Sequence, residues 1–282
     1  MNYSIIRKIL GVVIQFTGAF LALPAVCGLF YGEKQAIVYA VLSIAYFVIG
    51  RIISGFKLRS HAYYAREGLV IVGMSWIVIS ILGAIPLVIT KDIPNFTDAL
   101  FETVSGFTTT GSSILSDVEA LSHTGLFWRS FTHWVGGMGV IVFILAVLPM
   151  TGGYNMNLMR AESPGPTVGK LVPRMKDTAK ILYSIYFGIT VTEIIVLVIV
   201  GMPLFDALCI SFGSAGTGGF GVRNDSCAGY STLLQGIITV FMILFGINFN
   251  LFYLRKYRHG NCGSVYSAAG FCRRYTLNSV HA

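Results

Sequence analysis

Charged side chains are scarce in this 282-residue chain, where Asp, Glu, Lys and Arg together make up 11% of the residues. An ordinary soluble domain carries roughly 25%. Hydrophobic residues account for 55% of the chain, and its mean hydropathy is +0.74. This balance excludes an ordinary soluble protein and predicts an integral membrane protein.

Signatures of catalysis, metal binding and disulfide bonding are also missing. The 5 cysteines form no CxxC pair, and their odd number argues against a disulfide framework. There is no HExxH motif, nucleophile elbow or dinucleotide fingerprint in its proper context. A phosphate-loop likeness at residues 165–171 fails because Pro164 stands at the required glycine and Leu171 replaces the magnesium-binding Ser or Thr. We therefore expect neither an enzyme nor a cofactor site.

Apolar runs of near the ~20 residues that cross a bilayer occur repeatedly along the chain. Six of them predict transmembrane helices, at about residues 9–30, 35–54, 69–90, 127–150, 181–202 and 233–254. If the N-terminus is cytoplasmic, sixteen of the twenty Lys and Arg residues lie inside, and only Lys34, Lys91, Arg129 and Arg223 lie outside. This bias predicts a multi-pass cell-membrane protein with both termini in the cytoplasm, and it explains the net charge of +8 without a nucleic-acid partner.

Two polar, glycine-rich segments interrupt this pattern and align with each other at an offset of 108 residues. The first runs from Asp98-Ala99-Leu100 to Gly111, and the second from Asp206-Ala207-Leu208 to Gly219. Non-helical backbone survives at membrane depth only where protein or a watery cavity surrounds it. A repeated Thr/Gly segment between spanning helices therefore predicts an ion pore.

Each segment begins with a stretch short enough to be a half-helix, residues 95–107 in the first and 204–214 in the second. The C-terminal end of such a helix carries partial negative charge, which would favour a dehydrated cation. The Thr/Gly runs that follow could aim successive carbonyl oxygens at that ion. Close helix packing of the GxxxG kind is the alternative explanation, and the shared register of the two segments argues against it.

Several motifs give the chain a family resemblance over about residues 1–255. They are Phe101-Glu102, Ser105-Gly106, residues 108–111, Trp128-Arg129, residues 134–139 and residues 214–220. Together they resemble the membrane subunit of bacterial Trk/Ktr potassium uptake systems. That resemblance implies one critical glycine per repeat, at Gly111 and Gly219, with Thr109, Thr110, Thr217 and Gly218 as further potassium ligands.

The expected fold class is an all-α integral membrane protein with helix–pore loop–helix repeats preceded by two extra transmembrane helices. Residues 1–66 would hold the two extra helices, 67–150 the first repeat, 151–180 a cytoplasmic link, 181–254 the second repeat and 255–282 a basic cytoplasmic tail. Basic residues of the link could contact anionic lipid or, as the resemblance implies, a cytosolic nucleotide-binding regulatory subunit.

The chain departs from the family in having two repeats, because a complete member has four around one pore. The change in composition after Leu254 indicates a truncated or frame-shifted chain, with a natural half-size protein as the alternative. Two copies could supply four filter strands as a homodimer.

Four polar residues outside the filter are further candidates. Glu193, within an apolar span, is either a functional carboxylate or a partner of a helix end. Arg129 and His133 share a helix face, and we expect them to contact the pore helix or interfacial water. Glu102 could add negative potential at the mouth of the pore or anchor the first pore helix.

Two functions from different classes follow. Potassium uptake through a backbone-carbonyl filter is favoured. The alternative is a non-conducting half-length fragment or an assembly partner of a full-length transporter. A secondary transporter with an organic substrate is a distant third, because both repeats run in the same direction.

Overall fold

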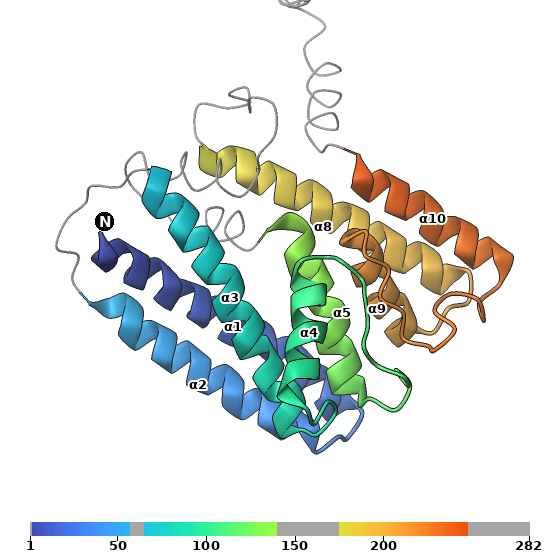
Figure 1. The fold of residues 1–282 in the computed structure, drawn as a ribbon. Helices are drawn as coiled ribbons and strands as arrows, with labels where there is room; N and C mark the ends of the chain where they lie inside the picture. Colours follow the sequence, from blue (N-terminus) through green and yellow to red (C-terminus); the bar gives the residue numbers. More distant parts are fainter. Residues whose placement is uncertain (1, 57–64, 140–174, 248–282) are drawn as a thin grey trace, which may run out of the picture. The chain divides into compact units, whose positions relative to one another are not determined.

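The computed structural model describes residues 2–56, 65–139 and 175–247, and regular structure within these ranges is entirely α-helical, as predicted (Figure 1). The helices belong to one compact unit, residues 1–246. The C-terminal parts of the fourth and sixth predicted spans lie outside the described residues. So do the predicted tail and most of the predicted link.

The two extra helices, α1 (Tyr3–Phe30) and α2 (Gln35–Gly55), form a tightly packed pair. A β-carbon on Gly18 would lie 2.7 Å from the carbonyl oxygen of Ser43, and one on Gly50 would also meet α1 backbone. The Ser43 hydroxyl donates a hydrogen bond of 2.7 Å to the carbonyl of Gly18. Lipid provides no hydrophobic driving force between helices, so the close packing that small residues allow holds this pair together.

A long helix, a short helix and a further helix then follow twice. Their bounds are α3 (Ala65–Ile89), α4 (Phe96–Phe107) and α5 (His123–Met138), then α8 (Met175–Ile199), α9 (Leu204–Ala215) and α10 (Thr232–Gly246). Among the described residues, α1, α2 and most of α3 and α8 are long and apolar enough to cross a membrane. The order agrees with two helix–pore loop–helix units after two extra helices.

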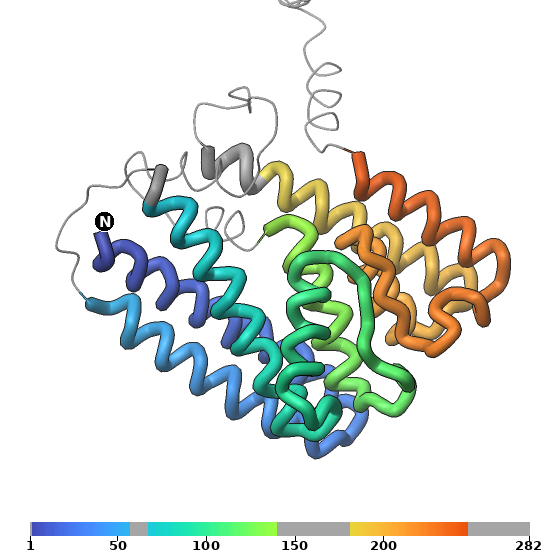
Figure 2. The backbone as a smooth tube through the Cα atoms, in the orientation of Figure 1, coloured from blue at the N-terminus to red at the C-terminus, as the bar shows by residue number. Residues whose placement is uncertain are grey.

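Helix α5 occupies the centre of this arrangement, between α4 of its own repeat and α9 of the next (Figure 2). The Trp128 indole on one of its faces donates a 2.9 Å hydrogen bond to the carbonyl of Gly83 in α3. The ring of Phe131 lies 5.5 Å from that of Phe212 in α9. Because α5 packs against both short helices, it links the two repeats.

The N-terminus of α5 is capped by carboxylates from two earlier loops. Glu33 accepts hydrogen bonds from the backbone amides of His123 and Thr124, at 2.8 and 2.9 Å, and Asp92 accepts from the amide of Ser122 at 3.1 Å. Partial burial raises the pKa of Glu33, but the hydrogen bonds from Thr124 and His123 outweigh it, so the net shift of this pKa is downward. Negative charge at a helix N-terminus is also favoured by the helix dipole.

Candidate selectivity filter

The two short helices correspond residue for residue. Both α4 and α9 have 12 residues, and their first and last residues stand 108 positions apart. Asn95, at the end of the preceding loop, caps α4 by accepting a 2.9 Å hydrogen bond from the Thr97 amide. The predicted half-helices at 95–107 and 204–214 are therefore confirmed to within one residue at each end.

The backbone after each helix also repeats. Thr109 and Thr217 both have φ of 55°, and Gly111 and Gly219 both have φ of 77°. Positive φ is uncommon for any residue other than glycine and costs energy at threonine. The Thr109 amide donates to the carbonyl of Gly106 at 3.0 Å and the Thr217 amide to that of Ser214 at 2.8 Å, which are aligned positions. One unusual conformation is thus built twice.

The two segments lie directly against one another. A β-carbon on Gly111 would overlap the carbonyl oxygen of Gly218, and one on Gly218 would lie 2.8 Å from the carbonyl oxygen of Thr109. Thr110, Thr217 and Gly219 are exposed instead, and a β-carbon on Gly219 would have no neighbour within 4 Å. Three of the six predicted filter residues, Thr109, Gly111 and Gly218, therefore lie together, and the other three are exposed beside them.

The oxygen atoms present at this site are backbone carbonyls and threonine hydroxyls. No cluster of three or more His, Cys, Asp or Glu that could hold a metal occurs in the part of the chain that the structure describes. Both short helices end at the site, and the partial negative charge of a helix C-terminus favours cations. Carbonyl oxygens with this field suit a monovalent cation that has shed its water.

Glycines in α5 allow it to reach the ends of both short helices. A β-carbon on Gly136 would overlap the carbonyl of Phe107 and lie 3.1 Å from the methyl group of Thr109. One on Gly137 would lie 3.1 Å from the carbonyl oxygen of Ala215. The glycine-rich motif at residues 134–139 therefore forms a wall behind both filter segments.

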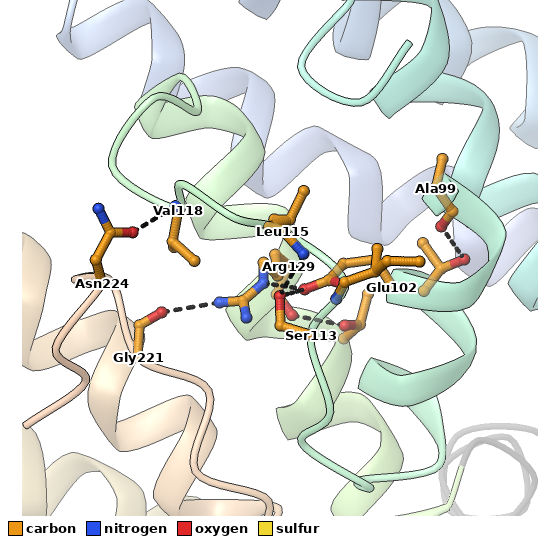
Figure 3. Close-up of polar contacts among 11 residues, drawn as sticks. Ala99, Glu102, Ser113, Leu115, Val118, Arg129, Gly221 and Asn224 are labelled. Carbon is orange, nitrogen blue, oxygen red and sulfur yellow. Dashed lines mark hydrogen bonds and ion pairs between the residues drawn. The ribbon is translucent and has the colours of Figure 1, made fainter. Parts of the chain in front are cut away.

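A buried ion pair supports the strand that leaves the first filter segment (Figure 3). Arg129 Nε lies 2.5 Å from Glu102 Oε1, and the two side chains are 3% and 1% exposed. Glu102 also accepts from the Ser113 hydroxyl at 2.9 Å and the Ile114 amide at 3.1 Å. These bonds favour the anchoring role for Glu102 over a free charge at the mouth, and they confirm that Arg129 contacts the pore helix.

The same arginine reaches the second segment. Its Nη1 donates a 2.8 Å hydrogen bond to the carbonyl of Gly221, as Figure 3 shows, and its guanidinium lies 3.6 Å from the ring centre of Phe220. Hydrogen bonds made by charged groups are stronger than neutral ones, and stacking on an aromatic ring adds to them. Arg129 thus ties the strands after both filter segments to one helix.

The outer loops of the two repeats are joined by a residue that the sequence did not single out. Asn224 Oδ1 accepts a 2.7 Å hydrogen bond from the Val118 amide (Figure 3). Its Nδ2 donates a hydrogen bond of 2.9 Å to Asp117. An asparagine in a turn offers both a donor and an acceptor. Nothing in its spacing from Asp117 indicates the contact, because more than a hundred residues separate the two.

Glu193 lies in α8 with its side chain fully buried. Neither of its carboxyl oxygens has a hydrogen-bond partner among the described residues, although the Ser214 side chain lies beside it. The carbonyl of Ser214 bonds to the amide of Thr217. Glu193 is therefore next to the end of α9.

Comparisons with known proteins agree with this geometry. A family model described as TrkH, cation transport protein, matches residues 37–258. The Trk system potassium uptake protein TrkG of Escherichia coli is 35% identical over 266 residues, and TrkH of Salmonella typhimurium is 36% identical over 257. These alignments cover 90% and 89% of this chain but 54% and 53% of the relatives, so the chain spans about half their length.

A solved structure shows the same arrangement of helices. The crystal structure of the potassium transporter TrkH from Vibrio parahaemolyticus superposes with a TM-score of 0.76 and 28% sequence identity. The match covers 90% of this chain and 52% of that one. Family match, sequence identity and fold agree, and the chain belongs to the TrkH family of cation transport proteins.

Proposed function

We propose that this chain contributes filter strands to a potassium uptake pathway across the cell membrane. Its carbonyl ligands come from Thr109, Thr110 and Gly111 of the first repeat and from Thr217, Gly218 and Gly219 of the second. Potassium is the transported ion, and no cofactor takes part. The related proteins are named as potassium uptake proteins and one as a potassium transporter, which supports this choice of ion.

One observation carries the proposal, namely the repeated backbone conformation at the two segments. In each segment φ is positive at the Thr and at the Gly, but not at Thr110 or Gly218 between them, so its sign alternates along the chain. Such alternation lets neighbouring carbonyl groups point to the same side, as a carbonyl-lined filter requires. The positive φ of Thr109 and Thr217 is a local strain of the kind kept at functional sites.

The exposed side of the site leaves room for further filter strands, which a second copy of the chain could supply. Two strands cannot surround an ion, and in this proposal two more come from a second copy of the chain in a symmetric homodimer. The chain's coverage of about half of its relatives supports this step, because a whole relative has room for both halves.

The proposed topology places both termini in the cytoplasm and opens the filter outward. Residues 1–66 form the extra helices, 67–150 and 181–254 the repeats, and 151–180 and 255–282 the cytoplasmic link and tail. The basic residues predicted on the inner side would face anionic lipid and a cytosolic nucleotide-binding regulatory subunit. The excess of Lys and Arg on that side supports this orientation.

The coverage of half of each relative also favours a second candidate function. In that case the chain inserts and folds but conducts only as an assembly partner of a full-length transporter, or not at all. Expression alone and together with a full-length relative separates the two functions.

The test is rubidium uptake and growth at low potassium in a bacterium that lacks potassium uptake systems, with membrane insertion measured in parallel. We expect uptake from the chain alone, and weaker discrimination between potassium and sodium in Gly111→Ser and Gly219→Ser. If the chain inserts into the membrane but shows no uptake of its own, the proposal is contradicted, whether or not uptake by a co-expressed full-length partner also stays unchanged. Unchanged ion discrimination in both variants would remove the filter assignment.

A further inference from the structure

His133 occupies an unusual place behind the second filter segment. Its side chain is fully buried in α5, and neither ring nitrogen has a hydrogen-bond partner among the described residues. The edge of the ring faces Phe220, with 4.0 Å between ring centres. Burying two unpaired polar atoms is costly, so the ring occupies this place at the expense of stability.

The ring lies against the backbone of the segment itself. A β-carbon on Gly218 would overlap His133 Nε2 and lie 2.7 Å from its Cδ2. One on Gly216 would lie 3.2 Å from the same Cδ2 and 2.9 Å from the His133 carbonyl oxygen. Real β-carbons do not approach heavy atoms so closely, so the space behind this strand is already filled.

Backbone conformation does not explain these two glycines. Gly216 has φ of −78°, in the ordinary helical region, and Gly218 is not among the positive-φ residues. The first segment has the same conformation but carries Thr108 and Thr110 at the aligned positions. Gly216 and Gly218 are therefore required because neighbouring atoms leave no room for a side chain, and many of these atoms belong to His133.

The His133 ring and Thr109 of the first filter segment both lie against Gly218. The virtual β-carbon of Gly218 lies 2.8 Å from the Thr109 carbonyl oxygen, a proposed ligand, while the Gly218 carbonyl meets Gly111. We propose that His133 is a positioning residue that holds the second filter strand in place beside the first and so sets the separation of their ion ligands. This inference rests on the proposed filter and adds to it a residue that tunes ion selectivity without touching the ion.

A double-mutant cycle tests the contact directly. Gly218→Ala alone should lower the unfolding temperature of the detergent-purified chain, and His133→Ala should make room for the new methyl group, so the double variant should be more stable than the sum of the two changes predicts. Gly111→Ala combined with His133→Ala is the matched control. The added methyl group of that variant meets Gly218 rather than the histidine, so we expect no rescue.

Ion selectivity tests the consequence. We expect His133→Ala to keep rubidium uptake but to lose about tenfold in its discrimination against sodium, because a shift of the strand misplaces the ligands. His133→Gln, which fills more of the space, should lose less and serves if the alanine variant folds poorly. Phe131→Ala removes a larger ring from another face of α5, where it packs against aromatic rings such as Phe20 and Phe212, and should leave discrimination unchanged.

The outcomes separate this inference from the proposed function. Strict additivity of Gly218→Ala and His133→Ala would overturn the positioning role, as would unchanged discrimination in His133→Ala. A wild-type chain that shows no uptake would contradict the proposed function instead. The stability cycle would then still decide whether His133 holds the strand.

Discussion

The first filter segment is held by charged side chains of its own repeat, whereas the second is held largely by α5 of the neighbouring repeat. Ile210 aligns with Glu102, and the part of α10 that corresponds to Arg129 carries Ile237 and Ile238, so the second repeat has no counterpart of the buried ion pair. It has instead the contacts that Arg129 and His133 make from α5. Both segments therefore share the end of a short helix and two residues of positive φ, whereas the side chains that support them differ.

Removing the charge that is peculiar to the first repeat should have the largest effect. Glu102→Ala leaves Arg129 buried without its partner, and breaking such a pair costs ~3–5 kcal/mol. The unfolding temperature in detergent measures this loss. Arg223→Ala is the control, because its pair with Asp206 at 3.5 Å is partly exposed and such pairs contribute ~0–1 kcal/mol.

Making the first repeat resemble the second sharpens this test. A double variant with Glu102→Ile and Arg129→Ile should recover most of the stability, since apolar residues of similar size often replace a buried ion pair at little cost. If Glu102→Ala were no more harmful than Arg223→Ala, the assigned role of the pair would be wrong.

The two critical glycines should differ although their φ angles agree. A side chain at positive φ costs ~1–2 kcal/mol, which Gly219→Ala should show alone because its β-carbon enters open space. Gly111→Ala adds the overlap with the Gly218 carbonyl and should cost ~1–3 kcal/mol more. Unfolding of both purified variants gives the difference, and equal losses would contradict the close contact between the segments.

The hydrogen bonds that join the outer loops should contribute less to the free energy of unfolding. Asn224→Ala removes the bonds to Val118 and Asp117, and a loss of ~1–2 kcal/mol is typical for such hydrogen bonds. Amide hydrogen exchange at Val118 should become faster. Asp225→Ala is the control, because this exposed neighbour has no side-chain hydrogen bond among those of the described residues. Equal exchange in the two variants would show that the loops are held by other contacts.

The smallest expected effect lies outside the repeats, at the cap of α5. The pKa of Glu33 is lowered in the folded chain, so its carboxylate contributes stability above the unfolded pKa of about 4.3, and that contribution is lost as pH falls through the folded value. Between pH 7 and pH 3, Glu33→Gln should show a smaller fall in unfolding temperature than the wild type. The assignment fails if the slopes of Glu33→Gln and the wild type agree.

Most of the fold could be predicted because it depends on local patterns. Apolar length and the 108-residue repeat located the helices and the filter segments, and proline and glycine located their ends. The filter residues could be named because a repeated pattern and a family resemblance agreed on them. Whether they bind potassium remains a prediction.

What the sequence could not supply was the set of contacts between distant segments. It placed Arg129 and His133 on one helix face but not against the second repeat, and it left Glu102 with two roles. The bonds of Asn224 to the first outer loop had no signal at all. Such contacts depend on how α5 packs between α4 and α9, and that packing is set by the whole assembly of helices rather than by any one segment.

The position of α5 also determines how this protein can be divided. By sequence α5 closes the first repeat, but its glycines, Arg129 and His133 form the wall of the second filter. A chimera that exchanges the second repeat at its sequence boundary would therefore combine a filter strand with a foreign wall. Because α5 also contacts the first filter segment and pairs Arg129 with Glu102, the unit that can be transplanted contains α4, α5 and α9 together, and the sequence boundary between the repeats does not divide the folded protein.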